Sequence, residues 1–160
     1  MYRRILVPVD GSHTSTLGLQ QAVRLAKNQS AQLRLVHVVD ESIITQDFGS
    51  YLNAGDLIDS LRDAGKKIIG NALALSRRHR INAQGALYET MGLRVADILV
   101  REAKKWKADL IVLGTHGRRG IDRMMLGSDA ETIVRTSPVP VLMVRSPGAA
   151  RRARKTARRR

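Results

Sequence analysis

The sequence GTHGRRGIDRMMLGS runs from Gly114 to Ser128, between a strongly apolar stretch and a helical pattern. Glycines at 114, 117 and 127 have no side chain to keep a phosphate away from the backbone N–H groups. A helix starting near Ser128 would direct the positive end of its dipole to the same place. This segment therefore predicts a phosphate-binding loop between a strand and a helix.

The glycine spacing matches neither of two common nucleotide-binding loops. No lysine follows the last glycine, as a Walker A loop requires, and GxGxxG does not occur. Ser128 has two possible roles, because its hydroxyl could cap the helix in a Ser-x-x-Glu box with Glu131 or donate to a phosphate. Both roles place the end of a helix at the predicted site.

Short apolar runs alternate with amphipathic stretches along the rest of the chain. Strands are expected at residues 4–9, 33–39, 82–88, 109–113 and 141–144, and helices around 19–26, 57–75, 95–106 and 128–136. This alternation predicts a single-domain, Rossmann-like α/β fold with a five-stranded parallel sheet in order 3-2-1-4-5 and helices on both faces. In such sheets ligands bind beyond the carboxyl ends of the strands where the order reverses, here between Asp10 and Gly114.

Several blocks resemble the universal stress protein family, in its ATP-binding type. They are Ile5 to Ser12, His37 to Asp40, the glycine segment with its Leu-Gly-Ser-x-Ala-Glu end, and Ser137 to Val144, so the resemblance covers residues 3–145. It implies ATP with Mg²⁺ as cofactors and a homodimer formed through the last strand, Val139 to Val144. That strand is apolar and expected at an open sheet edge, which proteins usually cover.

The resemblance also implies which residues bind the nucleotide. They are Pro8, Val9, Asp10, Val38, Gly114, His116, Gly117, Arg118, Gly127, Ser128 and Asp129, with Asp10 also near the metal. Asp129 departs from the family pattern, which usually has an apolar residue there, and its charge would repel a phosphate unless a cation intervenes.

Simpler roles remain open for several of these residues. Asp10 could be a turn residue, and the Val38 side chain could belong to the core. His116 could bond to its own loop, and Arg118 could belong to a solvated basic surface. His37 is expected to be a core or strand-end histidine with satisfied hydrogen bonds.

The chain has 160 residues, no cysteine and a formal charge of +14, and residues 151–160 contain seven Arg or Lys and no acid. We expect a globular domain at 1–146 and a disordered basic tail at 147–160 that binds nucleic acid only non-specifically. The absence of cysteine fits a reducing compartment, and no apolar segment predicts membrane insertion, so a cytoplasmic protein is expected.

No hydrolytic motif accompanies the glycine segment. Neither Gly-x-Ser-x-Gly nor a Ser/His/Asp context occurs, and His116 is the one loop residue that could act as a base near neutral pH. The leading hypothesis is a nucleotide-binding module for stress response or signalling, with slow or no hydrolysis. The alternatives are a slow ATPase or adenylate-processing enzyme, and a protein that binds nucleic acid or anionic surfaces through its tail.

Overall fold

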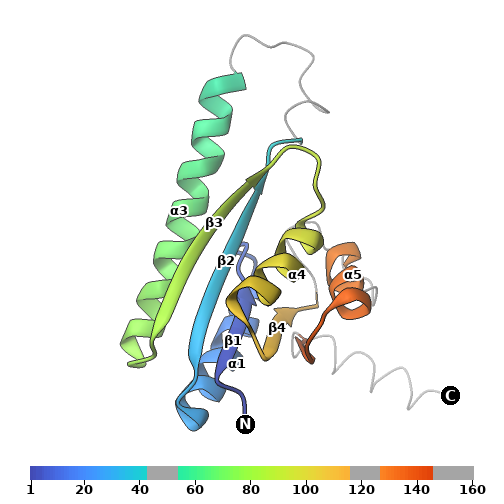
Figure 1. The fold of residues 1–160 in the computed structure, drawn as a ribbon. Coiled ribbons are helices and arrows are strands. Elements are labelled where there is room, and N and C mark those ends of the chain that lie inside the picture. Colours follow the sequence, from blue (N-terminus) through green and yellow to red (C-terminus); the bar gives the residue numbers. More distant parts are fainter. Residues whose placement is uncertain (43–53, 116–126, 146–160) are drawn as a thin grey trace, which may run out of the picture.

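A computed structural model describes residues 1–42, 54–115 and 127–145. Five parallel strands form one sheet in the order β3-β2-β1-β4-β5, as predicted (Figure 1). The strands are β1 (Arg4–Pro8), β2 (Gln32–Asp40), β3 (Ala83–Thr90), β4 (Leu110–Gly114) and β5 (Val141–Val144). The described helices are α1 (His13–Gln29), α3 (Ala54–Arg78), α4 (Val95–Trp106) and α5 (Ser128–Thr136).

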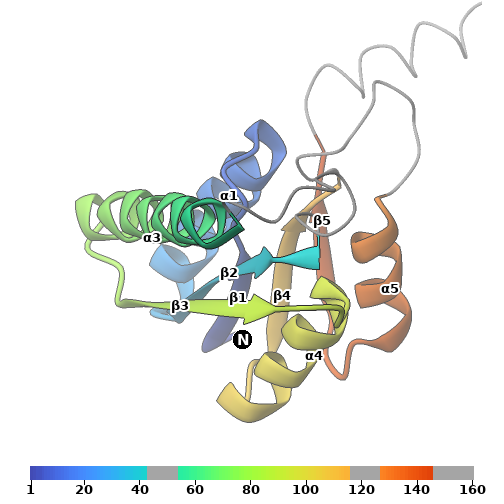
Figure 2. The same cartoon turned by 90° about the horizontal axis from the view of Figure 1, so that it is seen from above.

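Both faces of the sheet are covered, because successive residues of β1 point to opposite sides. Ile5 and Val7 pack in one buried cluster with residues of α1 and α3, whereas Leu6 packs in a second cluster with residues of α4 and α5. Figure 2 shows α1 and α3 on one side of the sheet and α4 on the other. The chain is therefore a three-layer α/β/α structure, with its central strands buried on both sides.

The predicted Ser128–Glu131 capping box is wrong. The N-cap of α5 is Gly127, whose backbone is extended and whose carbonyl accepts the N–H of Glu131 at 2.9 Å. Ser128 is thus the first residue inside the helix, where its hydroxyl does not occupy the capping position, and the cap makes no side-chain hydrogen bond.

Parts of the predicted site lie outside the described residues. These are His116, Gly117 and Arg118 in the glycine segment. The predicted basic tail at 147–160, which is separate from that site, also lies outside them. None of the helices in the described ranges combines the length and apolar character needed to cross a membrane.

Candidate functional site

The candidate site lies where the strand order reverses. The chain turns from β1 toward β2 and β3 on one side and continues with β4 and β5 on the other, so β1 and β4 are neighbours. The carboxyl ends of these two strands lead to Asp10 and Gly114. This is the position at which doubly wound sheets open a crevice for ligands.

Asp10 organises the turn from β1 into α1. Its Oδ1 accepts the N–H of Ser12 at 2.9 Å, and its own N–H donates to Ser15 Oγ at 3.1 Å. Gly11 between them has φ +79°, a left-handed conformation that favours glycine. Asp10 therefore makes the turn contacts of its simpler expected role. A carboxylate can accept several hydrogen bonds, so this role is compatible with a ligand role.

Ser12 and Ser15 complete this turn, and the sequence analysis assigned them no role. Ser12 is the N-cap of α1, and its Oγ accepts the N–H of Ser15 at 3.1 Å. Ser15 is buried in the first turn of the helix. The signal that could have found them is the Asp-Gly-Ser-x-x-Ser spacing, because a capping serine bonds to the N–H three residues later.

Gly114 is held by packing. A side chain there would place its Cβ 2.6 Å from the carbonyl carbon and oxygen of Thr14, in the first turn of α1. The start of α5 is joined to the same strand end, since Gly127 N–H donates to the carbonyl of buried Thr115 at 3.3 Å. The N-termini of both α1 and α5 thus lie at the end of β4.

Gly127 is the more open of the two glycines. A Cβ on Gly127 would meet only the Thr115 carbonyl oxygen, at 3.9 Å, which is an ordinary contact distance. Its φ is −61°, so its backbone conformation does not require glycine. Within the described residues, neither strain nor crowding explains why this position lacks a side chain.

The backbone of Val38 faces the end of β1. Gln32 N–H donates toward β1, to the Arg3 carbonyl, and the Val36 carbonyl accepts the N–H of Val9, both at 2.8 Å. Successive strand residues direct their backbone groups to opposite neighbours, so even-numbered residues of β2 face β1. Pairing ends at Pro8 opposite Val36. Hence the N–H and carbonyl of Val38 point past the end of β1, while its side chain packs partly into the α4 cluster.

His37 is a buried histidine of the core, as predicted. Its Nδ1 lies 2.6 Å from the carbonyl oxygen of Val9, and the residue is only 6% exposed. Because a carbonyl oxygen can only accept, Nδ1 carries the proton and donates. This hydrogen bond joins β2 to the residue that precedes Asp10.

Carboxylates surround this end of the sheet. Asp10 follows β1, Asp40 is the last residue of β2 and Glu41 follows it. Asp129 lies in the first turn of α5. The described residues contain no group of three or more His, Cys, Asp or Glu that could hold a metal by itself. Phosphates at this end would therefore need cations from the glycine segment or a metal shared between one carboxylate and the phosphates.

The fold defines a doubly wound α/β protein. Its candidate ligand crevice lies where the strand order reverses, between the ends of β1 and β4. A family model described as the universal stress protein family matches residues 1–145. The chain belongs to that family.

Relatives cover nearly the whole chain. The universal stress protein YxiE of Bacillus subtilis is 35% identical over 151 residues, covering 91% of this chain and all of YxiE. A solved universal stress protein family structure from Burkholderia pseudomallei has a TM-score of 0.73 and 34% identity, covering 89% of this chain and 96% of that one.

Two more distant structures of similar fold contain nucleotides. The universal stress protein from Archaeoglobus fulgidus in complex with dAMP is 22% identical, with a TM-score of 0.64 over 89% of this chain and 97% of that one. A family protein from Arabidopsis thaliana with AMP bound is 14% identical, with a TM-score of 0.65 over 92% and 94%. At these identities the likeness shows the fold alone.

Proposed function

We propose that this protein is a cytoplasmic, dimeric nucleotide-binding module that holds ATP with Mg²⁺ between the carboxyl ends of β1 and β4. Its nucleotide state is read by partners in a stress response, and hydrolysis is slow or absent. The nucleotide complexes of more distant proteins with this fold support a nucleotide as the ligand.

The observation that carries the proposal is the direction of the Val38 backbone. One N–H and one carbonyl, held in fixed geometry by β2, face the space beyond β1. The Watson–Crick edge of adenine offers one acceptor and one donor side by side, so it matches this pair. Guanine presents a carbonyl oxygen where adenine has its amino group, which would face the Val38 carbonyl and leave buried acceptors unpaired. We therefore expect adenine to be preferred.

From a base at Val38, a nucleotide would extend past Asp10 toward the end of β4. The Asp10 carboxylate would accept from ribose hydroxyls or hold Mg²⁺, while Gly127, Ser128 and the start of α5 would donate backbone N–H groups to phosphates. The missing side chain at Gly127 then has a reason, because a phosphate needs close approach to that backbone.

A magnesium ion suits the charges at this end. Mg²⁺ is commonly held by one or two carboxylates together with phosphate oxygens, and the described site offers that kind of oxygen ligand at Asp10. When bound, the ion would neutralise phosphate charge. Arg118 is proposed to add a second cation, and Asp129 makes such cations more necessary.

The homodimer is proposed to form through the outer edge of β5. This strand ends the sheet on one side, and its Val141 and Met143 direct their backbone groups away from β4, because Ile111 and Thr115 pair with the carbonyls of Pro140 and Val144. An antiparallel partner strand would satisfy the outward groups.

The adenine contact can be tested with two substitutions at one position. Val38→Pro removes the N–H that faces the site but none of the hydrogen bonds that β2 makes to β3, whereas Val38→Ala shortens the side chain and keeps the N–H. Calorimetry with ATP and GTP, with and without Mg²⁺, should show at least a tenfold loss of ATP affinity in the proline variant only. Equal ATP affinity in both variants, at unchanged melting temperature, would contradict the proposal.

The nature of the ligand can be tested independently. Mass spectrometry of the small molecules retained by the purified protein should identify an adenine nucleotide. Retention of a different ligand class, with no calorimetric signal for ATP, would show that the site serves another purpose.

A further inference from the structure

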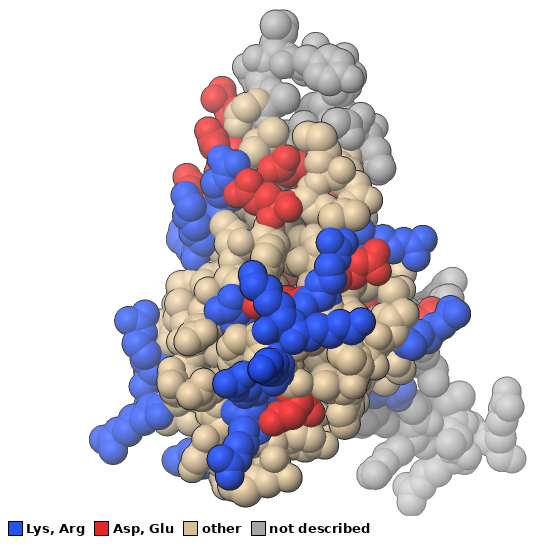
Figure 3. Space-filling model, in the orientation of Figure 1, with Lys and Arg blue, Asp and Glu red and all other residues tan. Residues whose placement is uncertain are grey.

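Charge is divided between the two ends of the sheet. At the amino ends of the strands, where α1, α3 and α4 finish, the described chain carries many cations, and the acid Asp109 directly precedes β4. Both carboxylate oxygens of Asp109 already accept backbone N–H groups, from Arg3 and Arg4. On the face seen in Figure 3, acidic side chains gather toward the carboxyl ends of the strands and basic ones toward the middle and the opposite end.

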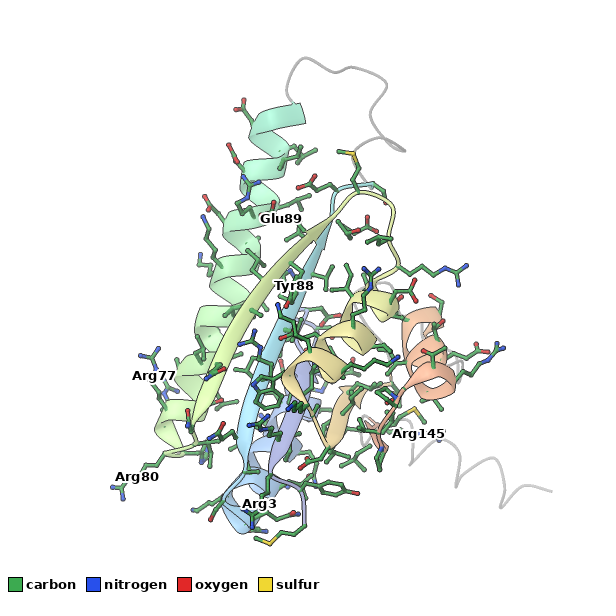
Figure 4. The ribbon with its side chains drawn as sticks, in the orientation of Figure 1. Arg3, Arg77, Arg80, Tyr88, Glu89 and Arg145 are labelled. Atoms are coloured by element: carbon green, nitrogen blue, oxygen red, sulfur yellow. The ribbon has the colours of Figure 1, made fainter. Side chains whose placement is uncertain are left out.

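The amino end is also hollowed. A depression of about 720 Å³ lies between the end of α1 and the end of α3. Its lining contains Lys27, Arg78, His79 and Arg80 among uncharged polar and apolar residues. No acidic residue lines it. Figure 4 shows Arg77 and Arg80 extending outward at this end of α3. The backbone of Arg3 lies beside the lining residue Gln32, whose N–H donates to the Arg3 carbonyl at 2.8 Å.

The cations that line the depression form no ion pair with a described carboxylate. Arg34, Arg62 and Lys66 each form an ion pair with a carboxylate, at distances of 2.5 to 2.9 Å. Among the described residues, Lys27, Arg78 and Arg80 form none. Cations in the last turn of a helix suit its dipole, which accounts for Lys27 and Arg78. The helix dipole does not account for Arg80, which lies beyond the end of α3, or for the absence of acidic residues from the lining of the depression.

The backbone that holds Arg80 is strained. Arg80 has φ +59°, in the left-handed region where an arginine is disfavoured relative to glycine or asparagine. Glycine there would relieve the strain but remove the cation. The conformation is held because Ile81 N–H donates back to the Ser76 carbonyl at 3.0 Å. Ser30 and Lys107 end α1 and α4 in the same left-handed conformation, so this helix ending is shared, and at α3 it places a cation at the rim of an acid-free depression.

We propose that this basic depression binds the phosphate backbone of nucleic acid, independently of the nucleotide site and of the C-terminal tail. The cations continue beyond the depression to Arg77 and Arg3, which favours a polyanion with phosphates repeating along a strand over a compact ligand. The lining has no aromatic residue for base stacking, so binding is insensitive to sequence and decreases with salt.

The test uses the full-length chain and two variants that lose the same number of charges. The first is Lys27→Gln with Arg78→Gln and Arg80→Asn, where asparagine tolerates the left-handed backbone. The matched control is Lys66→Gln with Lys67→Gln and Arg94→Gln, away from the depression. The tail is present in all three proteins, so a difference between the variants reports on the folded domain.

Binding of a fluorescein-labelled DNA duplex is measured by anisotropy over a series of salt concentrations. In the first variant we expect affinity to fall at least tenfold and the slope of log K against log salt to shrink by about 2 to 3, since each lost phosphate contact contributes about 0.9. The control should change much less, and calorimetric ATP affinity and melting temperature should stay the same in both. A failure of ATP binding in the parent protein would leave this outcome unaffected.

Three results would overturn the proposal. Equal losses in the two variants would show a general charge effect. Competition of inorganic tripolyphosphate with the duplex at equal phosphate concentration would indicate a site for compact polyphosphates. Binding to phosphatidylserine vesicles but not to the duplex would indicate a membrane surface.

Discussion

The carbonyl group of Thr14 occupies the space that a side chain on Gly114 would need, 2.6 Å from the position of its Cβ. The first turn of α1 is therefore seated directly on the end of β4. This contact brings Asp10, which precedes α1, beside the strand end that leads into the glycine segment. The geometry of the candidate site thus depends on a helix–strand contact that only glycine permits.

Serine substitutions at the two described glycines of the segment should separate folding from ligand binding. Gly114→Ser should destabilise the protein by about 1–3 kcal/mol or more, because the new Cβ collides with backbone atoms that cannot rotate away. Gly127→Ser should change stability by only a few tenths of a kcal/mol, since Cβ has room and serine is a good N-cap. Urea denaturation measures both effects.

The Gly127 variant also tests where the phosphates of ATP bind. We expect Gly127→Ser to weaken calorimetric ATP affinity at least tenfold with its fold intact, because the side chain occupies the approach of a phosphate to the start of α5. An ATP affinity equal to that of the wild type would show that the phosphates do not bind at Gly127.

The buried Glu102 links α4 to two strands. Arg34 Nε donates to one of its oxygens at 2.8 Å, and the Tyr88 hydroxyl donates to the other. Figure 4 shows Tyr88 on β3. Tyr88→Phe would leave a carboxylate oxygen without this donor, so we expect a loss of about 1–3 kcal/mol in the free energy of unfolding.

Tyr88 should also make stability depend on alkaline pH. Burial, followed by the hydrogen bond to Glu102 and its charge, raises the pKa of Tyr88 above its ordinary value of 10.0. Because the folded-state pKa is the higher one, the contribution of Tyr88 is complete below about pH 10 and is lost as pH rises from there through the folded-state pKa. Denaturation curves from neutral pH to pH 11 should fall more steeply for the wild type than for Tyr88→Phe, and parallel curves would contradict the assignment.

Proline substitutions in β5 should distinguish its inner from its outer edge. Met143→Pro removes an N–H that points away from β4, which an edge strand tolerates, whereas Leu142→Pro removes one that pairs with β4. We expect the Met143 variant to remain folded but become monomeric in light scattering, and the Leu142 variant to lose stability. A folded, dimeric Met143→Pro protein would place the interface elsewhere.

ATP turnover should be far below the roughly 1 to 100 per second of kinases. Rapid hydrolysis needs a base that positions water, charge neutralisation at the γ-phosphate and exclusion of bulk water. Asp129 lies exposed in the first turn of α5, open to bulk water and not in a site that excludes it. Single-turnover measurements with radiolabelled ATP check this. A rate of about one per second that disappears in His116→Ala or Asp129→Ala would identify an enzyme.

The sequence by itself determined the strands, the helices and the sheet order. The apolar runs at 4–9 and 109–113 are typical of strands that are buried on both faces. The alternation of strands with helices then leaves few possible topologies. The same reasoning predicts a ligand site at Asp10 and Gly114, because parallel strands all end at one edge, and that site stays a prediction. His37 was also assigned correctly to the core.

Only the tertiary structure decided how individual groups are used. Ser128 follows a glycine that is itself a good N-cap, so local sequence could not tell which residue would cap α5, and the capping box proved wrong. The direction of the Val38 backbone follows from where β1 stops along β2, and the need for glycine at 114 follows from a helix that begins about a hundred residues earlier. Such properties depend on register and on contacts between distant segments, whereas the pattern of apolar residues reports only which side of each element is buried.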